Sequence, residues 1–82
     1  MEKQIGTVSH WFDKINVAVI KLTEPLAVGD TIKIKHGNEE FEETVSSLQV
    51  DHEDVEKTKK GDEAAVKLSQ KAKEHSLVYK VE

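Results

Sequence analysis

The sequence predicts an all-β fold, a small closed barrel of six strands. Three observations favour it. Apolar residues alternate over short runs, glycine or proline separates the runs at intervals of roughly 8–14 residues, and no long segment has a helical period. Closure would remove exposed strand edges, and it would give a short chain one shared core. We expect one domain over residues 1–82, because a chain this short buries too little surface for two cores.

Each predicted strand rests on its alternation and on the turn signal that ends it. The clearest is 31–36, in which Ile32 and Ile34 share one face and lysines occupy the other. The segment 15–22 is apolar on both faces, so we expect it to be covered on both sides or to cross between sheet faces. Pro25 ends that segment. The six predicted strands are residues 4–9, 15–22, 31–36, 41–50, 64–68 and 77–81.

The predicted strand 41–50 changes parity midway along its length. A bulge near residues 46–47 would bring Val45, Leu48 and Val50 to the same side. We therefore expect one long, bulged strand here.

The last third of the chain supplies two further expectations. Residues 51–60 contain a single apolar side chain, Val55, so we predict a solvated connection. In the final strand, Tyr79 shares its parity with Leu77 and Val81, which predicts that the tyrosine ring lies in the core.

Charge is strongly segregated along the chain. Residues 38–56 carry eight acids and no lysine, whereas residues 57–80 carry seven lysines and three acids. The net charge of −4 gives no support to bulk nucleic-acid binding. All twelve basic residues are lysine, so any anion contact would be loose and sensitive to salt. The two blocks are either solvated faces that keep the barrel soluble or surfaces that bind partners.

Several function classes are disfavoured by what the sequence lacks. The absence of cysteine excludes disulfides and thiol nucleophiles, and it fits a cytoplasmic protein. The first residues lead into no long apolar segment, so we expect no secretory signal, and no apolar run reaches the roughly 18 residues that would span a membrane. There is no phosphate-binding Gly-x-x-x-x-Gly-Lys-Ser/Thr loop and no Gly-x-Ser-x-Gly elbow. We expect no GTP binding, no cofactor and no enzymatic activity.

The densest candidate for metal binding is the run Asp51-His52-Glu53-Asp54. It lacks the glycine and the spacing of a calcium-binding EF-hand loop, so we interpret it as a solvated acidic loop and predict no metal site. If the hairpin loops gather at one end of the barrel, His10 and His52 would approach one another and form a weakly pH-sensitive feature.

Two adjacent aromatic residues, Trp11 and Phe12, lie in the predicted first hairpin loop. Neighbours in a strand point in opposite directions, so one ring would close the barrel end while the other packs outside. In the alternative, the pair contacts a protein or an unstacked base, with nearby lysines supplying charge. The candidate partner-binding residues are Trp11, Phe12, Lys14, Lys57, Lys59 and Lys60, with Lys71 and Lys73 as further contacts.

The order of motifs resembles a known family. Gly6-Thr7-Val8, residues 16–22 and the run Pro25-Leu26-Ala27-Val28-Gly29-Asp30-Thr31-Ile32 are similar to the domain II β-barrel of translational GTPases such as elongation factor Tu. His10-Trp11-Phe12-Asp13 and Val78-Tyr79-Lys80-Val81 resemble small stand-alone translation elongation factor-like proteins. A related barrel ends some U32-type peptidases. Two positions depart from the pattern: Glu74-His75-Ser76 replaces a usual Gly-Asp turn, and Ala65 replaces a common glycine.

The resemblance implies a Greek-key-like barrel that binds and does not catalyse. Its partner would be RNA, the ribosome or a translation-related protein. The alternative is an accessory subunit, for example of a U32-type peptidase, whose acidic residues 39–56 meet a basic partner without RNA contact. The oligomeric state stays open.

Overall fold

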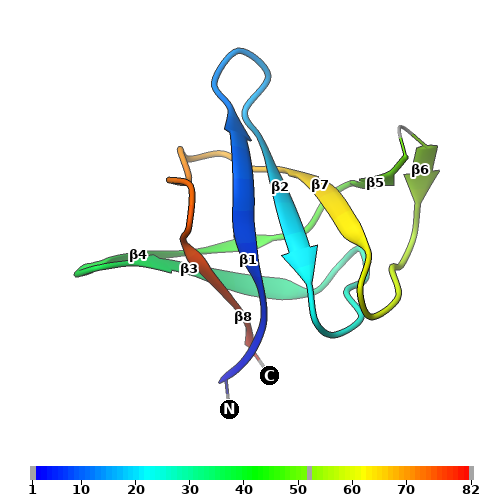
Figure 1. The fold of residues 1–82 in the computed structure, drawn as a ribbon, viewed down its shortest axis with the longest axis horizontal. Coiled ribbons are helices and arrows are strands. Elements are labelled where there is room, and N and C mark those ends of the chain that lie inside the picture. Colours follow the sequence, from blue (N-terminus) through cyan, green and yellow to red (C-terminus); the bar gives the residue numbers. More distant parts are fainter. Residues whose placement is uncertain (1, 52, 82) are drawn as a thin grey trace.

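Eight antiparallel strands form a single coiled sheet in the computed structural model, which describes residues 2–51 and 53–81 (Figure 1). The all-β prediction is confirmed. Within the described residues, no helix is long and apolar enough to cross a membrane. The strands are β1 (Glu2–Phe12), β2 (Val17–Leu22), β3 (Thr31–His36), β4 (Glu39–Thr44), β5 (Leu48–Val50), β6 (Glu53–Val55), β7 (Glu63–Lys67) and β8 (Leu77–Val81).

The prediction of a closed six-stranded barrel is not confirmed. The hydrogen-bonded order is β4-β3-β8-β1-β2-β7-β5-β6, so the sheet is open and ends at β4 and β6. The predicted strand 41–50 is divided into β4 and β5, because Val45 leaves the ladder and bonds the turn that contains Gly29 and Asp30. The segment 51–60, predicted as a solvated connection, supplies β6. β4 and β5 follow one another in the chain but lie far apart in the sheet order, so the sheet must curve around its core.

The first hairpin is longer than its alternation indicated. β1 runs to Phe12, so Trp11 and Phe12 are strand residues, and the turn comprises residues 13–16. A shift of register between Val8 and His10 lets β1 follow the curvature of the sheet.

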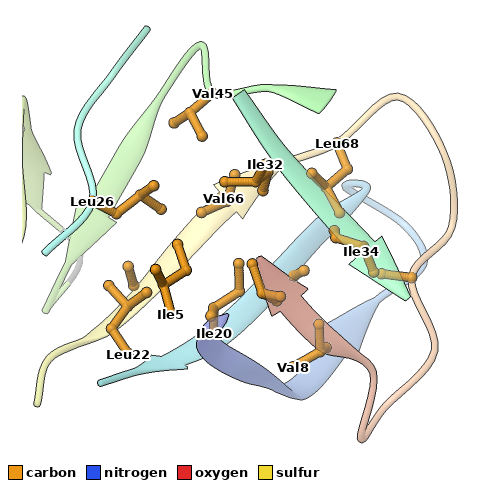
Figure 2. Close-up of a cluster of buried hydrophobic side chains, with 14 of the residues drawn as sticks. Ile5, Val8, Ile20, Leu22, Leu26, Ile32, Ile34, Val45, Val66 and Leu68 are labelled. Carbon is orange, nitrogen blue, oxygen red and sulfur yellow. The ribbon is translucent and has the colours of Figure 1, made fainter. Parts of the chain in front are cut away.

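Aliphatic side chains from the strands converge into one core (Figure 2). Ile32 and Ile34 are fully buried, as their alternation predicts, and so are Val45 and Leu48 on either side of the break between β4 and β5. Trp11, Phe41, Val50 and Val55 are partly buried and pack against this core. The fully packed centre is therefore aliphatic, with the aromatic rings at its margin. The buried apolar residues are Ile5, Val8, Ala18, Ile20, Leu22, Leu26, Ile32, Ile34, Val45, Leu48, Ala64, Val66, Leu68, Ala72 and Val78.

The expectation for Tyr79 is wrong. Val78 is the fully buried residue of β8, whereas Tyr79 is half-buried and Leu77 is exposed. β8 is paired on both sides, and its registers place Val78 opposite Gly6 of β1 and Ile34 of β3, both on the core face. The parity of Leu77, Tyr79 and Val81 is the more apolar one, so the sequence favours the face of β8 that the fold does not bury.

Three tight turns share one pattern of backbone hydrogen bonds. Each turn has four residues, and the N–H of its fourth residue donates to the C=O of its first. A buried residue from elsewhere in the chain, its partner, makes two further hydrogen bonds with the turn. The partner's C=O accepts the N–H of the third turn residue, and the partner's N–H donates to the C=O of the fourth. All nine N···O distances lie between 2.8 and 3.2 Å. The turns are Ala27–Asp30, Lys59–Asp62 and Lys73–Ser76, and their buried partners are Val45, Leu22 and Val8. These turns fix the points where β3, β7 and β8 begin.

The third position of each turn adopts a left-handed backbone conformation. Gly29 and Gly61 have φ values of 97° and 91°, and His75 has a φ of 71°. The side chains of Asp30 and Asp62 each accept the N–H of the first turn residue at 2.9 Å. The departure from Gly-Asp at the last turn therefore leaves its backbone geometry unchanged.

Thr58 joins two loops inside the protein. Its N–H donates to the C=O of Leu26 at 2.7 Å, and its Oγ1 accepts the N–H of Leu26 at 3.0 Å. Both residues are buried. We expect Thr58→Val to lower the free energy of unfolding by about 1–3 kcal/mol, because the Leu26 N–H loses its acceptor away from water. Urea denaturation measures this loss, and Thr58→Ser, which keeps the hydroxyl, should cost clearly less. Equal costs for the two variants would contradict the role of this hydrogen bond.

Candidate protein-docking surface

The outward side of β2 is apolar and only partly covered. Ala18, Ile20 and Leu22 face the core, whereas Val17 and Val19 face outward and are half-buried. This arrangement explains why the segment is apolar on both parities. Of the two expected forms, the segment does not cross between faces, since one parity faces the core along all of β2, and its cover is complete on that side only.

Neighbouring strands extend this apolar region. The registers place Phe12 of β1 beside Val17, and Ala65 of β7 beside Val19. Ile15 lies in the turn between β1 and β2. Phe12 and Ile15 are 44% and 59% exposed. We call this set the outer apolar surface; its residues are Phe12, Ile15, Val17, Val19 and Ala65, and they line a shallow depression of about 550 Å³ together with Gln49, Asp51 and Glu63.

Charged side chains surround the outer apolar surface. Lys21 lies opposite Glu63 on the adjacent strand, and Lys67 lies opposite Val17. An apolar centre with a polar rim is the usual anatomy of a protein–protein interface. Ala65 keeps the centre shallow, because its methyl group leaves the neighbouring Val19 partly uncovered. The surface therefore fits a protein partner.

The two aromatic candidates have different environments. Trp11 is half-buried and packs against the core, and its Nε1 donates to Oδ1 of Asp13. Phe12 belongs to the outer apolar surface, where its ring meets that of His10 edge-on at a centroid distance of 4.3 Å. Of the two, only Phe12 offers a large exposed area to a partner.

The candidate lysines do not form one cluster. Lys14 lies in the turn beside the start of β2, where Asn16 C=O accepts the N–H of Leu68. Lys59 and Lys60 lie in the turn bonded to Leu22 at the other end of β2 (Figure 1). Lys57 forms an isolated antiparallel β-bridge with Ala27, in the same region as Lys59 and Lys60. Lys57, Lys59 and Lys60 are therefore not folded near the aromatic pair, because the length of β2 separates them from it.

Lys71 and Lys73 lie on a third part of the surface. They line a cavity beneath the β3–β4 hairpin, and Lys73 Nζ is 3.7 Å from Oε2 of Glu39.

Four residues of the outer apolar surface were not among the sequence candidates: Ile15, Val17, Val19 and Ala65. The sequence indicates the apolar character of three of them, Ile15, Val17 and Val19, because the segment 15–22 is apolar on both parities. An outward apolar row is uncovered only when no further layer packs on it, and this depends on the tertiary fold.

The expected histidine pair lies partly outside the described residues, because His52 is not among them. His10 Nδ1 lies 3.0 Å from Oε2 of Glu74. Within residues 2–51 and 53–81, no group of three His, Asp or Glu side chains is arranged to hold a metal ion.

Comparisons with known proteins point to proteases. No protein-family model matches the chain. It is 42% identical over 77 residues to a protein of Methanocaldococcus jannaschii named an uncharacterized protease. The match covers 93% of this chain but only 19% of that relative.

Two crystal structures of the C-terminal domain of a Geobacillus thermoleovorans putative U32 peptidase superpose with TM-scores of 0.87 and 0.90. They cover 93% and 98% of this chain, and 96% and 93% of their own chains. This chain has the same fold. At sequence identities of 10% and 11%, the two structures show a likeness of fold alone.

The identification with translation elongation factor-like proteins is wrong. The relative is named a protease and the matched structures come from a U32 peptidase, so the expected roles in translation, on the ribosome and in RNA binding lose their basis. The run Ala27-Val28-Gly29-Asp30 misled for a physical reason. Its turn requires a residue that tolerates positive φ, followed by a carboxylate that accepts an N–H, and the same geometry recurs at Lys59–Asp62. The Gly-Asp motif therefore indicates a type of turn and does not identify a family.

Proposed function

We propose that this chain is a non-catalytic accessory module that docks onto the body of a U32-type peptidase through its outer apolar surface. The observation that carries the proposal is the exposure of Phe12 and Ile15 beside the outward valines of β2. The protease relative and the shared fold support the choice of partner. The cytoplasmic location expected from the lack of cysteine stays a prediction.

The energetics favour docking by the centre of this surface. Full burial of a Phe or Ile side chain contributes about 1.5–3 kcal/mol, so the exposed parts of Phe12 and Ile15 would each contribute about 1 kcal/mol. Val17 and Val19 are held in a strand and lose little freedom on binding, which lowers the entropic cost. The rim charges Lys21, Glu63 and Lys67 would set the orientation of the partner.

The test is the affinity of the chain for a purified U32-type peptidase from the same organism, measured by isothermal titration calorimetry. Ile15→Asp should weaken binding at least about tenfold, because it places an unpaired charge in the interface. Val28→Asp is the matched control, since Val28 is also exposed (44%) but lies in a different turn. Failure of the wild-type chain to bind, or equal binding by the two variants, would overturn the proposal.

A further inference from the structure

β4 is an unpaired edge of the sheet. It lies at one end of the strand order and, among the described residues, it pairs with β3 alone. Figure 1 shows the β3–β4 hairpin reaching out from the rest of the sheet. An edge strand presents alternate N–H and C=O groups that are free to pair with another extended chain.

The two faces of β4 differ in chemistry. Glu40 and Glu42 are exposed on the face that also carries Lys33 and Lys35. Phe41 points to the other face and packs against the core. On that face lies a cavity of about 140 Å³, whose lining combines the apolar Ile34, Phe41 and Ala72 with polar side chains that include Lys71 and Lys73. An added strand would therefore meet carboxylates on one face and a small recess of mixed polar and apolar lining on the other.

The carboxylates of Glu40 and Glu42 are only weakly neutralised by their own sheet. Lys33 donates a hydrogen bond to Glu2, and this bond raises the pKa of Lys33 and lowers the pKa of Glu2. The Nζ of Lys33 lies 4.0 Å from a carboxylate oxygen of each of Glu40 and Glu42, and Lys35 lies 4.0 Å from Glu40. Both carboxylates therefore keep lone pairs for further donors.

We propose that β4 binds an extended polypeptide segment as an additional antiparallel strand. Lysine or arginine side chains of that segment face Glu40 and Glu42, and its alternate, uncharged side chains lie over the recess beside Phe41. This is recognition by β-strand addition, in which backbone hydrogen bonds give affinity and alternate side chains give selectivity. The inference concerns a different surface from the outer apolar surface and holds whether or not a peptidase binds there.

The charge of β4 argues for this occupant over a second copy of the chain. Glu39, Glu40, Glu42 and Glu43 are all acidic, and β4 contains no lysine. Two copies paired edge to edge at β4 would place like charges opposite each other, which destabilises a sheet. A segment in which basic residues alternate with uncharged ones would instead place opposite charges across the strand pair.

The test uses a terminally blocked peptide, Lys-Val-Lys-Val-Lys-Val, which matches β4 in length. Binding to the full chain is measured by fluorescence anisotropy at low salt. A second peptide of the same sequence carries N-methyl groups on alternate residues, chosen so that one backbone edge cannot donate hydrogen bonds; a third carries them on the opposite edge. If the peptide adds as a strand, one of the two methylated peptides should bind at least about tenfold more weakly, and the other should bind like the parent.

Variants of the chain test the charge pairing. Glu40→Gln combined with Glu42→Gln should weaken binding about fivefold to tenfold, whereas Glu56→Gln, at an exposed acid outside both surfaces, should leave it unchanged. Amide hydrogen exchange of β4 should slow when peptide is bound. Equal binding by all three peptides would mean that charge alone holds them, and it would overturn strand addition, as would absence of binding by the parent peptide.

Discussion

Gly6→Ala is expected to lower the free energy of unfolding by about 2–3 kcal/mol, at the upper end of the cost of overpacking. A Cβ at residue 6 would lie 2.5 Å from the carbonyl oxygen of Lys21 and 2.9 Å from Cγ2 of Ile20. The first contact is with backbone, so no change of rotamer relieves it. β1 would have to move away from β2, and the hydrogen bonds between them would lengthen. A domain of this size has about 4–12 kcal/mol of stability in total, so the loss is a large fraction.

Equilibrium urea denaturation followed by circular dichroism measures this effect. Gly29→Ala is the matched control, because open space surrounds Gly29 and only its positive φ opposes a side chain. That strain costs about 1–2 kcal/mol. The steric explanation fails if Gly6→Ala costs no more than Gly29→Ala.

Ile20→Ala is expected to cost about 2–5 kcal/mol, because it leaves a cavity at the centre of the core. Ile20 is fully buried and its side chain lies within the cluster of buried aliphatic side chains (Figure 2). It lies opposite Val8 on one neighbouring strand and Ala64 on the other. The small Ala64 cannot expand into the space that is created, so collapse would require movement of the strands.

Val19→Ala is the control on the opposite face of the same strand. Val19 is half-buried and borders the outer apolar surface, so its truncation should cost less than about 1 kcal/mol of stability. The same variant should weaken the proposed docking to the peptidase. Similar stability losses for the two variants, measured by thermal and urea denaturation, would show that the outward face of β2 is packed as tightly as its core face.

Much of the fold follows from local alternation. Ile32 and Ile34 face the core because a strand with one apolar parity has only one way to bury it, and the same holds for Ala64 and Val66. The break between β4 and β5 was not predictable in this way. It occurs where Val45 bonds a turn some fifteen residues earlier in the chain, which is a tertiary interaction. Closure of the sheet also depends on pairing between strands that are distant in the chain, so local alternation does not predict it.

The candidate site was predicted only in part. Trp11 and Phe12 are both candidates because two adjacent large rings cannot both enter a core, and the structure places Phe12, but not Trp11, on the outer apolar surface. The lysines were grouped with it by their charge, and charge carries no information about which end of β2 a loop occupies. The apolar pattern on both parities indicates that Val17 and Val19 belong to an apolar face, but only the fold shows which face stays partly exposed.

The three matched turns also govern how the molecule opens. Each joins the beginning of a strand to a core residue by two backbone hydrogen bonds, so the starts of β3, β7 and β8 cannot fray without exposing Val45, Leu22 or Val8 to water. No such turn precedes β4 or β6 among the described residues. β4 and β6 also pair on one side only, so we expect native-state opening to occur first at these two ends of the sheet, which are also the strands richest in acid. We expect the centre of the sheet to open last, whereas the margin at β4 can move with the least loss of strand pairing.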